Sequence, residues 1–140
     1  MVTLTASYKE FLKADTVDYI ESNLDEYALD DMLVFVDENS EDALVAHYDD
    51  YIQAGEDCGY AVVDAFVAEF GIEDVAYCAE AFVGSYGSEA DFAEEFYNEQ
   101  YNIPVELVVD WQQTWDSNLL YDFTFVGDGY RDGLVFRSNY

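Results

Sequence analysis

The chain has 140 residues, of which 51% are hydrophobic and 18% aromatic, so it is too apolar to be a disordered acidic tail and long enough for one sizeable core or a few small subdomains. Its 32 Asp and Glu against four Lys and Arg give a net charge of −28. This charge excludes nucleic acid and anionic membranes as direct partners and favours a basic protein partner or cations.

Residues 1–14 contain both lysines, Lys9 and Lys13, and predict a short strand or turn followed by one helical turn. The start of the chain resembles neither a signal peptide nor a basic presequence, and no run approaches the roughly 20 apolar residues of a membrane span. Cys58 and Cys78 lack metal-ligand spacing, which favours reduced side chains in helices. We therefore expect a soluble, cytoplasmic chain.

A first amphipathic helix is predicted to follow the lysines, with Asp15 or Thr16 as its N-cap. Its apolar residues recur at helical spacing: Val17, Ile20, Leu24, Tyr27 and Ala28. The next segment, 32–36, is short, rich in β-branched residues and bounded by acids, which predicts a strand.

A second long helix is expected to begin at a cap formed by Asn39 or Ser40, to run through about Ala54 and to end at Gly55. His47, the only histidine, lies on this helix without a second histidine to share a metal. No nucleophile stands at a defined spacing from it, so an ordinary surface histidine is favoured over a general base.

A third helix is predicted near 60–70, where Gly71 ends it, and another helix is expected to begin after Ile72. The glycines that follow predict an aromatic turn at 83–87. Two glycines without a following Lys are a weak signal for a phosphate-binding loop, and the acidic setting argues against one.

The central helix is expected at 89–101 with Ser88 as its cap. One side is apolar and consists of Phe92, Ala93, Phe96, Tyr97 and Tyr101. The acids Asp91, Glu94, Glu95 and Glu99 spread over the other side. Like charges three or four residues apart on a helix repel each other. A solvated helix face explains where these acids lie, but it does not explain why no lysine is interspersed among them.

The last third of the chain is predicted to hold one more helix and a β-hairpin. Pro104 suits the first turn of a helix, and apolar residues follow it at intervals of four: Leu107, Trp111, Trp115 and Leu119. The segments 123–126 and 134–137, with a Gly-Asp-Gly turn after the first, predict the hairpin.

These elements indicate an α+β fold that is mostly helical, an elongated modular chain with a small C-terminal β-hairpin and a short N-terminal strand element. We expect a small N-terminal α/β element at 1–40, an acidic helical domain at 41–101, and a helix-plus-hairpin subdomain at 102–140, or one continuous elongated domain.

The charge density of such a chain is comparable with that of DNA. A duplex carries one charge per roughly 1.7 Å of its axis, so 28 charges correspond to about 48 Å of DNA. A compact chain of this length has a radius of gyration of only roughly 14 Å. Core packing does not require so much self-repulsion, so the charge itself points to an acidic decoy for a basic partner.

An ordered series of segments in the second half resembles the ArdA-type antirestriction proteins. The series consists of Phe70-Gly-Ile-Glu-Asp, the aromatic-glycine segment 82–86, the acidic helix Glu89-Ala-Asp-Phe-Ala-Glu-Glu-Phe, Val109-Asp-Trp, Leu119-Leu-Tyr-Asp-Phe and Val135-Phe-Arg-Ser-Asn-Tyr. The resemblance covers 70–140. The predicted helix at 41–54 fits more loosely, and 1–36 do not show the N-terminal β-domain opening of the family.

The resemblance implies a DNA mimic from a phage or mobile element that acts in the cytoplasm of the bacterial host and evades its defence. Such proteins are elongated, usually homodimeric, and need no cofactor. They occupy the DNA-binding groove of type I restriction-modification enzymes. The carboxylates implied to imitate phosphates are Glu73, Asp74, Glu80, Glu89, Asp91, Glu94, Glu95, Glu99, Asp110, Asp116 and Asp122.

Other functions fit the composition as well. One is an acidic inhibitor or adaptor of a different basic protein, such as a polymerase, a nucleoid protein or a CRISPR effector. Another is a halophilic domain whose acids serve solubility alone. An enzyme is the least favoured class, because the sequence shows neither a cluster of metal ligands nor a nucleophile with its base.

Overall fold

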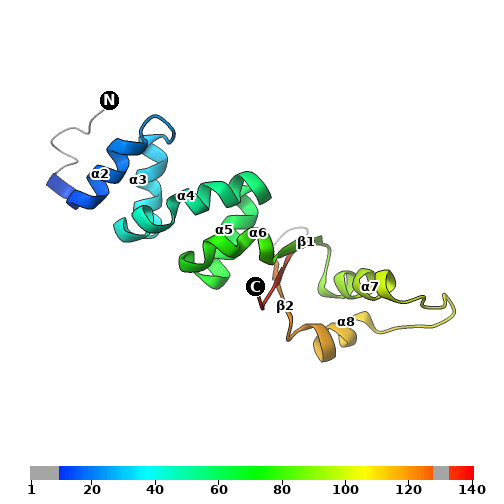
Figure 1. The fold of residues 1–140 in the computed structure, drawn as a ribbon. Helices are drawn as coiled ribbons and strands as arrows, with labels where there is room; N and C mark the ends of the chain where they lie inside the picture. Colours follow the sequence, from blue (N-terminus) through cyan, green and yellow to red (C-terminus); the bar gives the residue numbers. More distant parts are fainter. Residues whose placement is uncertain (1–9, 128–132) are drawn as a thin grey trace.

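The computed structural model describes residues 10–127 and 133–140. The chain is elongated, with the N-terminal helices at one end, a short helical region and a small sheet in the middle, and α7 and α8 at the other end (Figure 1). The fold is α+β and mostly helical, as the sequence predicted. Among the described residues, no helix is long and apolar enough to cross a membrane.

The N-terminal helices are α2 (Ala14–Asn23), α3 (Leu29–Glu38) and α4 (Glu41–Cys58). The predicted strand at 32–36 is wrong, because this segment lies inside α3. Met32 and Phe35 are buried three residues apart while Val34 is 54% exposed, which is a helical and not an alternating pattern. The burial of that helical face outweighs the β-propensity of the short run.

Helix α2 starts and ends earlier than predicted. Lys13 occupies the N-cap position without a side-chain cap bond, and Asp15 lies in the first turn. The helix ends at Asn23, whose side-chain amide donates a hydrogen bond to the carbonyl of Tyr19 at 2.8 Å. Leu24 and two further predicted helix residues therefore lie beyond the helix, although Leu24 still packs against the same core.

Ser40 caps α4 as predicted, since its Oγ accepts a hydrogen bond from the amide of Ala43 at 3.0 Å. The predicted end at Gly55 is wrong, because Gly55 is buried inside the helix, which continues to Cys58. The chain reverses only at Gly59, whose φ of +96° favours glycine.

Helix α5 (Tyr60–Phe70) and its end at Gly71, with φ of +100°, are as predicted. A 3₁₀ helix η1 (Ile72–Tyr77) and a short helix α6 (Cys78–Ala81) follow.

Strand β1 (Phe82–Tyr86) occupies the place where the sequence predicted a turn. It pairs antiparallel with β3 (Gly133–Arg137), and Gly84 lies opposite Val135 next to a bulge. The bare Cα of Gly84 leaves room for the ring of Tyr86 on the same side of the strand. The turn prediction failed because the pairing partner lies about fifty residues away, where local turn propensity carries no information.

The C-terminal hairpin of β2 (Phe123–Gly127) and β3 is confirmed, and the sheet order is β1-β3-β2. Most of the predicted Gly-Asp-Gly turn lies outside the described residues, as does the strand or turn predicted at the start of the chain.

Helix α7 (Glu89–Gln100) begins at the predicted cap, where the amide of Asp91 donates to Ser88 Oγ at 3.1 Å. The helix predicted from Pro104 is wrong in its first half, because 101–110 contain no helix. Asp110 instead caps α8 (Trp111–Thr114), which continues as the π-helical turn η2 (Trp115–Leu119). The valines before Asp110 favour extended backbone, and Leu107 remains 60% exposed.

Three hydrophobic clusters lie in a row along the molecule. The first joins α2, α3 and the start of α4, and the second joins the end of α4 to α5, η1, α6 and β3. The third joins α7, α8, η2 and the sheet. Helix α4 contributes to the first two clusters, while Phe136 and Val135 face the second and third from opposite sides of β3. This serial packing produces the elongated shape.

A candidate protein-binding surface of exposed carboxylates

All carboxylates that the structure describes lie at the surface. Of the 32 Asp and Glu, only Asp128 and Asp132 fall outside the described residues, and none of the other 30 is buried. Ionised carboxylates avoid the interior because burial removes their hydration. The elongated shape therefore carries its charge on the outside along its whole length.

Counter-charges are scarce around this surface. No Lys or Arg occurs between Lys13 and Arg131, so none of the elements from α2 to β2 contains either residue. Lys13 Nζ lies 3.4 Å from Asp42 Oδ1, and both side chains are exposed. Arg137 donates a hydrogen bond to the carbonyl oxygen of Glu80 at 3.0 Å.

The predicted phosphate-imitating carboxylates fall into two groups. Glu73, Asp74 and Glu80 lie on η1 and α6 in the middle of the molecule. The others lie on α7, at the N-cap of α8, in η2 and directly before β2, namely Glu89, Asp91, Glu94, Glu95, Glu99, Asp110, Asp116 and Asp122. The predicted carboxylates therefore lie in two separate stretches of the chain, 73–80 and 89–122.

On α7, a helical row of carboxylates lines a shallow hollow that is open to solvent. The row consists of Asp91, Glu94, Glu95 and Glu99, and Asn98 is the only neutral residue among them. Residues three and four apart on a helix lie about 5–6 Å apart. The outer face of α7 is thus a ridge of closely spaced negative charges, and the apolar face with Phe92 and Ala93 is buried.

Gln112 links this helix to the next one. Its side-chain nitrogen donates to Glu89 Oε1 and to Asp116 Oδ1, both at 3.2 Å. The two oxygens can therefore lie no more than 6.4 Å apart. A neutral amide holds both carboxylates in place without cancelling either charge. Asp110 is also engaged by a neutral donor, the amide of Gln113 at 3.0 Å.

Tyrosine hydroxyls hold several other carboxylates in the same way. Tyr140 donates to Asp74 Oδ2 at 2.6 Å, and both Tyr19 and Tyr27 donate to Asp49 Oδ1, at 2.8 and 2.9 Å. Burial, with the hydrogen bond and charge of Asp49, raises the pKa of Tyr27 to about 12. The sequence analysis missed these pairs. The 13 tyrosines among so many acids were the available signal.

The remaining candidates for chemistry are the two cysteines and the histidine. Cys58 and Cys78 are free thiols in α4 and α6, and burial raises the pKa of Cys78 to about 12. His47 is half-buried on α4. Among the described residues, no three His, Cys, Asp or Glu side chains are placed to hold a metal ion together.

Comparison of the chain with models of protein families, with curated proteins and with solved structures found no match. The resemblance to antirestriction proteins therefore stays a prediction from the sequence segments.

Proposed function

We propose that this protein is a DNA mimic, which competes with DNA for the binding groove of a DNA-binding enzyme. The observation that carries the proposal is that none of the 30 described carboxylates is buried, on an elongated body whose elements from α2 to β2 contain no Lys or Arg. Lys and Arg side chains that contact phosphates in the target would contact carboxylates instead.

The way the carboxylates are held supports mimicry over mere solubility. Glu89 and Asp116 share one neutral donor, Gln112, and Asp74 accepts a short hydrogen bond from Tyr140. Neutral donors order a carboxylate without removing its charge. Acids that serve only hydration need no such ordering, whereas an imitation of a regular phosphate array benefits from it.

The target that the sequence resemblance implies is a type I restriction-modification enzyme, whose inhibition protects incoming DNA in a bacterial host. Other basic DNA-binding proteins present the same chemistry. We also propose a homodimer. An apolar segment beyond α7 is strongly exposed, with Val105 at 96% and Val108 at 99%, and such surface is typical of an interface.

The test is displacement of a fluorescent duplex from the purified methyltransferase core of a type I enzyme, at several salt concentrations. We expect stoichiometric displacement that weakens as salt increases. If the folded protein displaces no duplex from this enzyme but does so from another DNA-binding protein, the target is wrong and mimicry stands. If it displaces DNA from neither, the proposal fails.

Two matched variants test whether the α7 end contributes most. The first, D91N/E94Q/E95Q/E99Q, neutralises the α7 row, and the second, D18N/D25N/E26Q/D30N, removes the same charge from the opposite end, where all four acids are also exposed. We expect a larger loss of displacement from the first. Equal losses would indicate a uniform charge effect without a defined binding end.

A further inference from the structure

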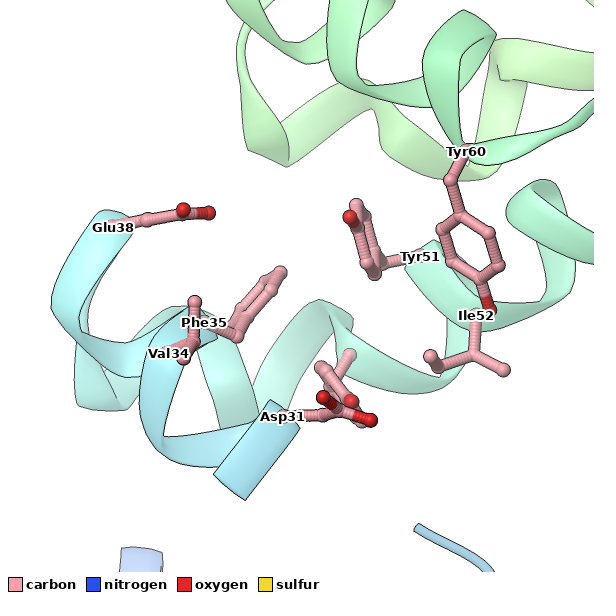
Figure 2. A pocket seen from close by; sticks show the side chains of 8 residues that line it. Asp31, Val34, Phe35, Glu38, Tyr51, Ile52 and Tyr60 are labelled. Atoms are coloured by element: carbon pink, nitrogen blue, oxygen red, sulfur yellow. The ribbon is translucent and has the colours of Figure 1, made fainter. Parts of the chain in front are cut away.

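A pocket of about 340 Å³ lies far from α7, between α3, α4 and the first residue of α5. Helix α3 contributes Asp31, Phe35 and Glu38, helix α4 contributes Tyr48 and Tyr51, and Tyr60 closes one side. Figure 2 shows Phe35 in the middle, with Asp31 and Glu38 on either side of it and the rings of Tyr51 and Tyr60 opposite. None of the residues that line this pocket belongs to the predicted phosphate-imitating carboxylates.

The aromatic part of the pocket is preformed. Phe35 and Tyr48 are 4% and 2% exposed, and their ring centroids are 5.0 Å apart at 77°. The Tyr51 ring lies 5.2 Å from Phe35 and 5.7 Å from Tyr60. Tyr60 itself is 43% exposed, so it forms an accessible wall over a packed floor. A ligand in this pocket meets aromatic rings that packing already holds in place.

The carboxylates give the pocket a negative potential. Asp31 and Glu38 lie seven residues apart on α3, so both belong to the helix face that borders the pocket. Burial, followed by the charges of Asp31 and Tyr60, raises the pKa of Tyr48 to about 12. The Tyr51 hydroxyl donates to Asp64 at 2.7 Å. Helices α3, α4 and α5 contain no Lys or Arg that could neutralise these groups, and the one histidine, His47 on α4, does not line the pocket.

Aromatic faces bordered by carboxylates suit one class of ligand above others. A cation over an aromatic ring is attracted by the negative face of the ring. A guanidinium group also stacks its flat surface on the ring and pairs its N–H groups with carboxylates. An anion is repelled by Asp31 and Glu38, and a small, strongly hydrated metal ion prefers several oxygen ligands to aromatic rings.

We propose that this pocket binds the guanidinium group of an arginine side chain that a basic protein partner presents. The preference for guanidinium follows from Phe35, Tyr60 and the two carboxylates alone. That the arginine belongs to the DNA-binding target rests on the proposed function. The pocket would then be a docking point that duplex DNA does not offer, in addition to the imitation of phosphates.

The first experiment titrates the full chain with N-acetyl-arginine amide and follows its backbone amides by NMR at physiological salt. We expect saturable shifts concentrated at 31–38, 48–52 and 60. N-acetyl-citrulline amide has nearly the same shape without charge and should cause none of them. Shifts that spread evenly over all acidic segments without saturation would overturn the proposal, because they would report general attraction to a charge of −28.

Two pairs of substitutions on α3 separate the pocket from the general field. D31N/E38Q removes the pocket carboxylates, whereas D30N/D37N removes the same charge from exposed residues that do not line the pocket. We expect the first pair to weaken arginine binding at least about tenfold more than the second. Y60L should weaken binding as well, with unchanged amide spectra at α7 showing that the fold is kept. Equal effects of the two pairs would overturn the proposal.

The displacement assay then distinguishes this inference from the proposed function. If the chain displaces duplex DNA and D31N/E38Q weakens displacement no more than D30N/D37N, the docking role fails and mimicry stands. If arginine binds in the pocket but no duplex is displaced, the proposed function fails and the chemistry of the pocket stands.

Discussion

The ring of Tyr60 lies directly over the Cα of Gly55, so that a Cβ at position 55 would overlap ring atoms Cδ1, Cε1 and Cζ. Gly55 is inside α4 and Tyr60 is the first residue of α5, with the reversal at Gly59 between them. A glycine inside a helix costs roughly 1 kcal/mol relative to alanine. Close packing of the Tyr60 ring offsets this cost, and the same contact positions the exposed wall of the arginine pocket.

Gly55→Ala should therefore separate stability from binding. The added methyl group forces the Tyr60 ring to move, while the helix gains up to about 1 kcal/mol of propensity. We expect the free energy of unfolding in urea to change by less than about 1 kcal/mol, and the affinity for N-acetyl-arginine amide to fall as it does in Y60L. In G55A/Y60L the clash is gone, so this protein should be more stable than Y60L alone. Unchanged arginine affinity in G55A would contradict the role of the Tyr60 wall.

Gly59 allows a test of backbone strain without any change in packing. A Cβ at this position would meet nothing within 4 Å, yet φ is +96°. Gly59→Ala should cost about 1–3 kcal/mol of unfolding free energy, because L residues rarely adopt this conformation. Gly127 is the matched control, since its Cβ would also meet nothing within 4 Å and its φ lies outside the left-handed region. A loss at Gly127 as large as at Gly59 would show that strain is not the cause.

Because Tyr140 donates a hydrogen bond to Asp74, the free energy of unfolding should fall as the pH rises above about 10. Burial, together with this hydrogen bond and the charge of Asp74, raises the pKa of Tyr140 from 10.0 to about 12. The folded state therefore holds the proton more tightly than the unfolded state. The resulting stabilisation is complete below pH 10 and is lost as the pH rises to about 12.

Tyr140→Phe should lower the free energy of unfolding by about 1 kcal/mol at pH 7, because it removes one hydrogen bond. The difference from the original protein should shrink above pH 10, because there the Tyr140 hydroxyl ionises in the unfolded state before it does so in the folded state. Urea unfolding of both proteins at pH 7, 9 and 11 measures this difference in the free energy of unfolding. Tyr121→Phe is the control, since Tyr121 is 74% exposed and should show no difference at any of these pH values. A difference that stays constant up to pH 11 would mean that folding does not raise the pKa of Tyr140.

Much of the helical fold was predictable because its signals are local. Ser40 and Ser88 cap their helices through hydrogen bonds to amides three residues on, and Gly71 ends α5 by its own conformation. The sequence predictions were wrong where a contact with another helix or strand decided the local structure. Gly55 lies inside α4, where the ring of Tyr60 from α5 packs against it. The segment 82–86 is a strand because it pairs with β3.

The candidate site, too, was predictable from the sequence only in part. That the carboxylates are exposed follows from residue type alone. The residue types do not predict which donors hold the carboxylates, because Gln112 and Glu89 are 23 residues apart and Tyr140 and Asp74 are 66 residues apart. The aromatic pocket also depends on three helices packing together, so no single stretch of sequence predicts it.

Salt should affect folding and binding in opposite directions. Repulsion along the α7 row destabilises the folded state by a few tenths of a kcal/mol per pair, and salt at about 1 M shortens the screening length to about 3 Å. The original protein should become more stable with added salt, and E94Q/E95Q/E99Q should be more stable than the original only at low salt. Circular dichroism during urea unfolding measures both.

Displacement of duplex DNA, in contrast, should weaken as salt increases, and E94Q/E95Q/E99Q should displace less duplex at low salt. A protein that remains unfolded below molar salt would instead support the halophilic alternative, because its acids would then need counter-ions in order to fold. A folded protein at about 0.15 M salt whose binding is indifferent to further salt would contradict the mimic, because contacts between carboxylates and basic side chains are screened on this scale. The two salt profiles together therefore decide whether the acidic surface serves folding or recognition.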